Sequence, residues 1–162
     1  MIYLYWLFFI DIMIKLKLVE QSKNYTCGPA VLKMILSYYG INKSESLLEK
    51  ETKTSNKHGC QESAIVKVAK NFGLKGYVKQ KSSISELRRL NKKGIPVIID
   101  WFSPDVNSHY SIVVGFKGDK IMIADPSFGK IRTFGIKWFE ERWFDMFNMK
   151  KPLIKEIIVI EK

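Results

Sequence analysis

Cysteine and histidine are scarce in this sequence of 162 residues, which contains two of each. Two cysteines cannot build the disulfide framework of a small secreted domain, and the composition fits a reducing compartment. The four residues, Cys27, Cys60, His58 and His109, form neither a C-x-x-C nor an H-x-x-x-H pattern. Zinc sites usually show such spacing. We therefore expect no metal ion and no other cofactor.

Long basic runs are also absent, although the net charge is +11. The lysines occur singly or in pairs, and no run of five basic residues exists. Clustered lysine and arginine are typical of a polyanion site, whereas scattered lysines are typical of a solvated basic surface. We therefore expect no nucleic acid among the partners of this protein.

No stretch of the sequence is apolar over the roughly 20 residues that a membrane-spanning helix needs. Residues 1–14 come nearest, but Asp11 interrupts them, and they lack the basic start and small-residue end of a signal peptide. Three interpretations stay open: a mistaken start codon upstream of Met13, a strand or helix packed on the core, and a shallow membrane anchor. We treat residues 1–14 as an apolar N-terminal extension. The expected location is cytoplasmic, with membrane association at the inner face through residues 1–14 as an open option.

Residues 15–162 are expected to form a single domain, since 46% of the chain is hydrophobic and 13% aromatic. Apolar residues recur at helical spacing in the first half, which predicts helices over 27–39, 44–52 and 61–71 and a fourth from Ser83. A short strand is expected at 74–81. The second half alternates with the period of strands, at 96–102, 109–116, 121–125, 130–134 and 153–162, with a late helix at 136–147. Helices followed by an antiparallel meander predict an α+β domain.

Cys27 opens the first predicted helix, one residue after Thr26, the expected N-cap. The dipole at a helix N-terminus favours the thiolate and so lowers the pKa of a thiol. Gly28 leaves room for the backbone of a substrate. A single cysteine is more commonly a buried apolar residue, so the nucleophile hypothesis depends on its partners elsewhere in the chain.

His109 begins a predicted strand and is the candidate base for Cys27. Strand alternation separates the side chains of this strand into two sets. One face should carry His109, Ser111 and Val113, and the other Tyr110, Ile112, Val114 and Phe116. An imidazole at the start of a strand lies near the edge of the sheet, where a cleft can form.

Asp125 ends the next predicted strand, after a tight turn at Gly118. In an antiparallel pair the end of one strand lies beside the start of the other, so Asp125 and His109 should be neighbours in space. A carboxylate in that position fixes the tautomer of the imidazole and stabilises the imidazolium. The same aspartate, before Pro126, is also typical of a turn.

Gln21 lies six residues before Cys27 and can donate its side-chain amide to an oxyanion, together with the backbone N–H of Cys27. A nucleophile from a helical half, with a base and an orienting carboxylate from a sheet half, is the papain-like arrangement. The four residues in this order favour a cysteine peptidase over four unrelated structural roles.

The segments QSKNYTCGPAVLKMILSYYG, HYSIVVGF and ADPSFGK resemble the three motifs of the bacteriocin-processing peptidases. These are papain-like cysteine peptidase domains that cut double-glycine leader peptides and are usually fused to an ABC exporter. The resemblance extends from about Val19 to Met146. It implies a papain-like cysteine peptidase fold, with a helical N-terminal half packed on an antiparallel sheet. It also implies site roles for Gln21, Cys27 and His109, with Asp125 as the orienting carboxylate.

No transporter helices and no Walker sequence follow the peptidase motifs. We therefore expect a free-standing domain that acts on a peptide or leader peptide, with a separate ABC exporter as an open option for a partner. The resemblance favours cleavage after small residues such as Gly-Gly. Two alternatives stay open. The same residues could transfer the acyl group to an amine instead of water, or the domain could bind a leader peptide without turnover.

Several other residues compete for roles in this site. Asp100 and Asp105 are rivals of Asp125 as the orienting carboxylate. Cys60 is more typical of a structural position than of a second reactive thiol, and His58 is expected to be exposed. The aromatic residues that could line a groove, but are more often core at such spacings, are Trp101, Phe102, Trp138 and Trp143.

Overall fold

A computed structural model describes residues 13–146 and 152–162 of the chain, so the expectations for residues 1–12 lie outside the described residues. Of the apolar extension, Ile14 is buried and donates its backbone N–H to the carbonyl of Val114 at 2.7 Å. The helices are α1 (Cys27–Tyr38), α2 (Glu45–Glu51), α3 (Glu62–Asn71), α4 (Ile84–Lys92) and α5 (Ile136–Glu140). The strands are β1 (Lys75–Lys79), β2 (Val97–Ser103), β3 (Asn107–Lys117), β4 (Lys120–Asp125), β5 (Lys130–Gly135), β6 (Phe144–Asp145), β7 (Leu153–Ile154) and β8 (Ile157–Glu161). In the ranges described, no helix has the length and apolar character needed to cross a membrane.

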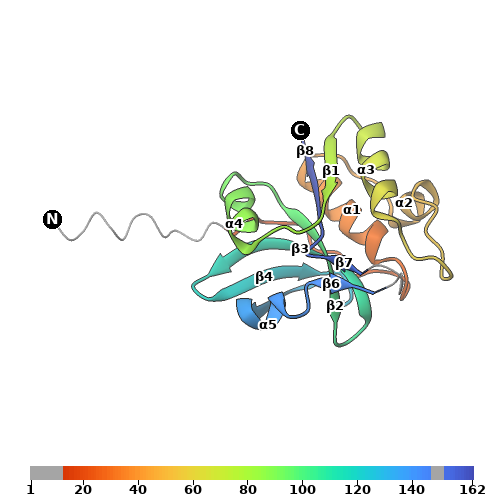
Figure 1. Ribbon diagram of the computed structural model, residues 1–162. Coiled ribbons are helices and arrows are strands. Elements are labelled where there is room, and N and C mark those ends of the chain that lie inside the picture. Colours follow the sequence, from red (N-terminus) through yellow and green to blue (C-terminus); the bar gives the residue numbers. More distant parts are fainter. Residues whose placement is uncertain (1–12, 147–151) are drawn as a thin grey trace.

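The main sheet has six strands in the order β1-β8-β2-β3-β4-β5, and each neighbouring pair is antiparallel. Strands β6 and β7 form a separate two-stranded sheet. Consecutive strands β2 to β5 form the expected meander, while β8 returns from the C-terminus to lie between β1 and β2 (Figure 1). Helices and an antiparallel sheet in one unit confirm the α+β class.

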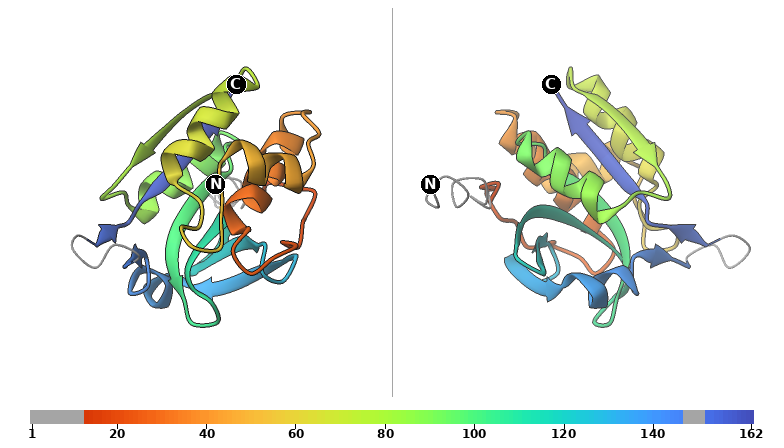
Figure 2. Two further views of the ribbon diagram at one scale, coloured as in Figure 1. Left: turned by 90° about the vertical axis from the view of Figure 1, so that its right-hand side faces the viewer. Right: turned by 60° about the vertical axis from the view of Figure 1, so that its left-hand side comes forward.

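Each face of the sheet has its own apolar core, because successive strand residues point to opposite faces. Buried residues of α1 and α3 pack with one set of strand side chains, which includes Ile98, Ile112 and Ile158. Buried residues of α4 and α5 pack with the other set, which includes Ile99 and Val113. Figure 2 shows α3 and α4 on opposite sides of β8. The helices of the first half are therefore divided between the two faces, with α4 opposite α1 and α3.

Helix boundaries follow the expected signals with one difference. The hydroxyls of Ser44 and Ser83 cap α2 and α4, and Gly40, with φ of 84°, follows the end of α1. Thr26 precedes α1 but makes no capping bond to that helix. Its hydroxyl instead binds the backbone N–H and carbonyl of Lys23, so the side chain closes the loop before the helix.

Two expectations for the second half are wrong. Phe116 belongs to the core of α4 and α5 and not to the face of Tyr110, because the β3–β4 register shifts between Val113 and Gly115. Such a bulge inverts the alternation of the side chains that follow it. The helix expected at 136–147 ends at Glu140, and the chain turns into β6.

The last strand and α2 also differ from expectation. The strand expected at 153–162 is broken into β7 and β8 at Lys155, where φ is 48°. In α2 the sequence predicts an apolar side formed by Leu47 and Leu48, but only Leu48 is buried and Leu47 is exposed.

Candidate active site

Cys27 is the first residue of α1, and its side chain is half-buried. The buried residues of the helix, from Gly28 to Leu36, hold α1 against the core, and this packing fixes the position of its first turn. The thiol lies close enough to the His109 ring, which comes from β3, to raise the pKa of that ring. The structure thus brings together the helix residue and the strand residue that the sequence pairs as nucleophile and base.

The His109 ring is buried, and its Nε2 atom lies 2.7 Å from Oδ1 of Asp125. This contact confirms the expected proximity of the two residues across the β3–β4 pair. It leaves Nδ1 as the ring nitrogen available to Cys27. Burial opposes protonation of the ring, but the hydrogen bonds with Asp125 and Cys27 outweigh burial and raise the pKa of His109 to about 9. The ring is therefore an imidazolium at neutral pH.

The carboxylate of Asp125 is surrounded by donors on both oxygens. Besides His109, Oδ1 accepts the backbone N–H of Ser127 at 3.0 Å, and Oδ2 accepts Nη1 of Arg132 at 2.9 Å. Burial raises the pKa of this carboxyl, but the bonds with His109, Arg132 and Ser127 outweigh it and hold the pKa below its usual value. Asp125 therefore stays ionised although it is buried.

Gln21 lies in the loop before α1, next to the turn that follows Asp125. Its backbone N–H donates to the carbonyl of Pro126, and its Oε1 accepts the Ser127 hydroxyl at 3.3 Å. Its Nε2 donates to the Lys23 carbonyl at 2.8 Å, which occupies one of the two amide hydrogens. The second hydrogen is available to a ligand, so the geometry is compatible with the expected donor role.

Asp100 and Asp105, the rivals of Asp125, have other partners. Burial, with Asp145 nearby, raises the pKa of Asp100 well above its usual range, and the two carboxyls share a hydrogen bond. Asp105 binds Nη1 of Arg132 at 2.9 Å. Asp100 thus lies beside Asp145, and Asp105 contacts the site through Arg132.

Cys60 has the structural position, and His58 the exposed position, that the sequence predicts. Burial raises the pKa of the Cys60 thiol to about 11, despite hydrogen bonds with two threonines that lower it. Such a thiol is a poor nucleophile at neutral pH. Its Cβ and Sγ lie against the backbone of Gly28, where a side chain on that residue would collide with them. The space beside Gly28 is therefore filled by Cys60, and not by the substrate backbone that the sequence led us to expect there. His58 is exposed.

The aromatic residues divide between core and rim. Trp101 and Trp143 are fully buried, and the Trp101 indole N–H donates to the Ser111 hydroxyl. The half-buried Phe102 stacks on Phe144 with ring centroids 5.6 Å apart. The two tryptophans are therefore core residues, and they do not line a substrate groove.

Two contributors to the site, Ser127 and Arg132, were missed from the sequence. The Ser127 hydroxyl lies 3.3 Å from both Gln21 Oε1 and His109 Nε2 and so connects the loop to β3. An aspartate followed two residues later by serine is a common turn pattern, and that signal was available. No sequence pattern indicates the role of Arg132, because its contact with Asp125 depends on the β4–β5 register.

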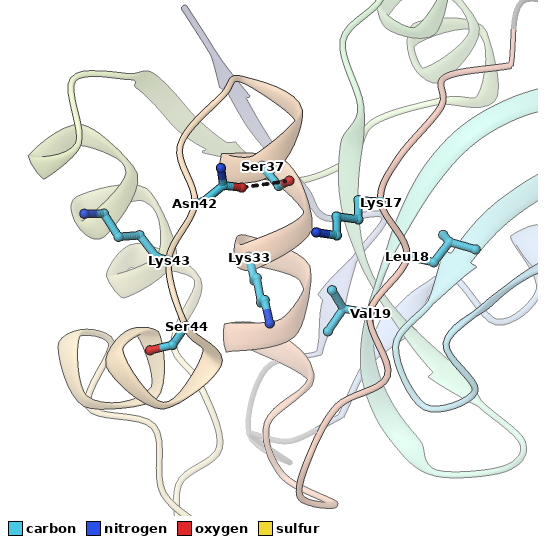
Figure 3. Close-up of a pocket in the computed structure, with 8 residues that line it drawn as sticks. All are labelled: Lys17, Leu18, Val19, Lys33, Ser37, Asn42, Lys43 and Ser44. Atoms are coloured by element: carbon cyan, nitrogen blue, oxygen red, sulfur yellow. Dashed lines mark hydrogen bonds between the residues drawn. The ribbon is translucent and has the colours of Figure 1, made fainter.

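A pocket of about 600 Å³ lies beside α1 but contains none of the four candidate residues. Figure 3 shows Lys17 and Lys33 reaching into the space between the segment before α1 and the helix itself. The remaining lining residues are Leu18, Val19, Ser37, Asn42, Lys43 and Ser44. Its lining is basic and contains neither a cysteine nor a histidine, so it does not share the residues of the candidate site. In the described parts of the chain, no three His, Cys, Asp or Glu side chains are placed to share a metal ion.

Comparison with known proteins finds one family model, described as the peptidase C39 family, which matches residues 15–150. The lactococcin-G-processing and transport ATP-binding protein LagD of Lactococcus lactis is 29% identical over 136 residues, or 84% of this chain. The chain spans only 19% of the length of LagD.

Solved structures show the same architecture. The peptidase domain of Streptococcus ComA superimposes with a TM-score of 0.73 at 27% identity, covering 90% of this chain and 97% of that domain. A double-glycine motif protease from an AMS/PCAT transporter, solved with its leader peptide, gives a TM-score of 0.71 at 23% identity, covering 92% of this chain and 93% of that one. The expected papain-like peptidase fold is thereby confirmed.

Proposed function

The chain belongs to the peptidase C39 family, and from this premise we propose that it is a cysteine peptidase with Cys27 as nucleophile. The observation that supports the proposal best is the buried contact of His109 with Asp125, beside a Cys27 thiol that raises the pKa of the same ring. An imidazolium beside a thiol at a helix N-terminus favours the thiolate.

In the proposed reaction, His109 as imidazolium already holds the proton that Cys27 has given up, and the thiolate sulfur attacks the carbonyl carbon of a peptide bond. The oxyanion accepts hydrogen bonds from the Gln21 side chain and the Cys27 backbone N–H. When the C–N bond breaks, the leaving amine takes the proton from His109 and a thioester remains on Cys27. Water then attacks the thioester with His109 as base, which releases the carboxylic acid and restores the thiol.

The proposed substrate is a leader peptide with small residues, such as Gly-Gly, before the cut. The support comes from similar proteins: LagD processes lactococcin G, and a protease of the same fold, solved with a leader peptide, bears the double-glycine motif in its name. Because LagD is by its name also a transport ATP-binding protein, an ABC exporter is the proposed partner.

Selective labelling of Cys27 tests the proposal. Iodoacetamide at pH 6 should modify Cys27 much faster than Cys60, as measured by peptide mapping, because only Cys27 has an imidazolium partner. His109→Ala should abolish the difference, and His58→Ala, at an exposed position, is the matched control. Equal reactivity of the two thiols in the unmodified protein would contradict the proposal. Mass spectrometry of the products with and without added amines separates hydrolysis from acyl transfer.

A further inference from the structure

We propose that Arg132 is a positioning residue of this site, which holds the Asp125 carboxylate in the orientation that His109 requires. The inference rests on the proposed function, in which His109 and Asp125 act together. It assigns a role to a residue outside the four that the sequence motifs contain.

The contacts of Asp125 show why its orientation depends on Arg132. One oxygen of the carboxylate is engaged by His109 and by the Ser127 backbone, and the other is engaged by Nη1 of Arg132. Rotation of the carboxylate away from His109 would break a charge-assisted hydrogen bond, which is stronger than a neutral one. Arg132 therefore restrains the carboxylate from the side opposite the imidazole.

Arg132 is itself held in place from three directions. Its Nη1 donates to Asp105 as well as to Asp125, each at 2.9 Å. The guanidinium carbon lies 4.5 Å from the ring centroid of Phe128 and 4.9 Å from that of Phe134. A guanidinium between two rings loses little freedom on binding a carboxylate, because the planar group is already ordered.

The positions of these residues in the fold explain the choice of an arginine. Arg132 lies on β5, and Asp105 lies in the turn between β2 and β3, the strand that carries His109. The Arg132 side chain therefore connects β5 to the β2–β3 hairpin across the end of β4, where Asp125 lies. This position needs a cationic side chain that reaches both carboxylates and offers each an N–H donor, which Nη1 of Arg132 does.

The positive charge of Arg132 also stabilises the Asp125 carboxylate, in addition to holding its orientation. The Asp125 side chain is fully buried, whereas that of Arg132 is 21% exposed. A buried carboxylate that loses one of its cationic partners is strongly destabilised. The guanidinium also repels the His109 imidazolium, but the carboxylate lies between them, so loss of orientation should outweigh relief of this repulsion.

The test compares Arg132→Gln, Arg132→Lys and Asp105→Asn with Arg89→Gln, a control at an exposed arginine. The rate of Cys27 alkylation by iodoacetamide is measured from pH 5 to pH 10 by peptide mapping, with the melting temperature of each variant. At pH 6, Arg132→Gln should slow alkylation about tenfold, the effect of one pKa unit, and move the profile toward that of a free thiol. Arg132→Lys should recover part of the loss. Asp105→Asn should give a smaller change in the same direction, and Arg89→Gln none.

A profile of folded Arg132→Gln that superimposes on that of the unmodified protein would overturn the inference. So would a lowered melting temperature with an unchanged profile, which is the signature of a purely structural role. If Arg132→Gln does not fold, the inference is tested by Asp105→Asn, because Asp105 is exposed and its substitution leaves the core intact. An unchanged alkylation profile of Asp105→Asn would then overturn the inference. Failure of the proposed function is distinguishable, since Cys27 would then lack selective reactivity in the unmodified protein.

Discussion

The Nε2 atom of His109 lies 2.7 Å from Oδ1 of Asp125, and the two side chains are 2% and 0% exposed. Water cannot replace either partner at this depth, so each depends on the other for its charge. The bond also fixes the ring, since Nε2 is occupied and Nδ1 is left for Cys27. Tests of this site should therefore separate the charge of the pair from its orientation.

Asp125→Asn removes the charge and keeps the size of the side chain. We expect hydrolysis of a fluorogenic peptide with Gly-Gly before the scissile bond to fall on the order of 10²-fold, because the imidazolium loses its counterion. The pKa of His109 should fall below about 9. Asp119→Asn, at an exposed turn position, is the control. An Asp125→Asn protein with full activity would exclude Asp125 as the orienting carboxylate.

The raised pKa of His109 predicts different pH limits for two reactions of Cys27. Hydrolysis needs the imidazolium proton for the leaving amine, so kcat should fall as pH rises through about 9. Alkylation needs only the thiolate, so its rate should not fall over the same range. Stopped assays of both reactions from pH 6 to pH 10.5 measure the difference. A parallel fall of both rates would show that His109 is not the acid.

Gln21→Ala tests the expected oxyanion donor. The loss of one such donor typically costs about 10²–10³ in kcat, while alkylation of Cys27 should be nearly unchanged because no oxyanion forms. Gln61→Ala, at an exposed position, is the matched control. Equal losses of hydrolysis and alkylation would indicate that Gln21 supports the Ser127 turn and not the oxyanion.

The sequence could predict most elements of the fold, because periodicity and turn residues are local signals. Helix starts are expected at Ser44 and Ser83, and the hydroxyls of both residues do cap helices. The position of Phe116 could not be found, because the bulge in β3 depends on pairing with β4. Similarly, only tertiary packing decides that α4 lies on the face opposite α1.

Some contacts of the candidate site could likewise be predicted from the sequence, and others could not. The contact of His109 with Asp125 follows from hairpin geometry, which the sequence shows through a tight turn between two strands. The partners of Asp100 and Asp105 could not be predicted, since each is set by a segment distant in the chain. Sequence motifs thus identify residues that touch substrate more readily than the residues that hold them.

A final prediction concerns stability and the buried carboxyl of Glu156, which precedes β8. Glu156 is 1% exposed, and its Oε1 has no hydrogen-bond partner among the residues that the structure describes. Burial, with the carboxylates of Glu62 and Asp145 nearby, raises the pKa of Glu156 to about 7. The folded state therefore binds a proton that the unfolded state releases near pH 4.5, and this contribution to stability is lost as pH rises through about 7.

Glu156→Gln resembles the protonated carboxyl at every pH. Relative to the unmodified protein, its free energy of unfolding should be similar at pH 4.5 and higher at pH 8.5 by on the order of 1 kcal/mol. Urea titrations followed by tryptophan fluorescence measure both values. Glu141→Gln, at a side chain that is 61% exposed, should show no such pH-dependent gain. A Glu156→Gln protein that is less stable at pH 8.5 would mean that the ionised carboxylate has a stabilising partner, because only a favourable interaction of the charged form can reverse the sign.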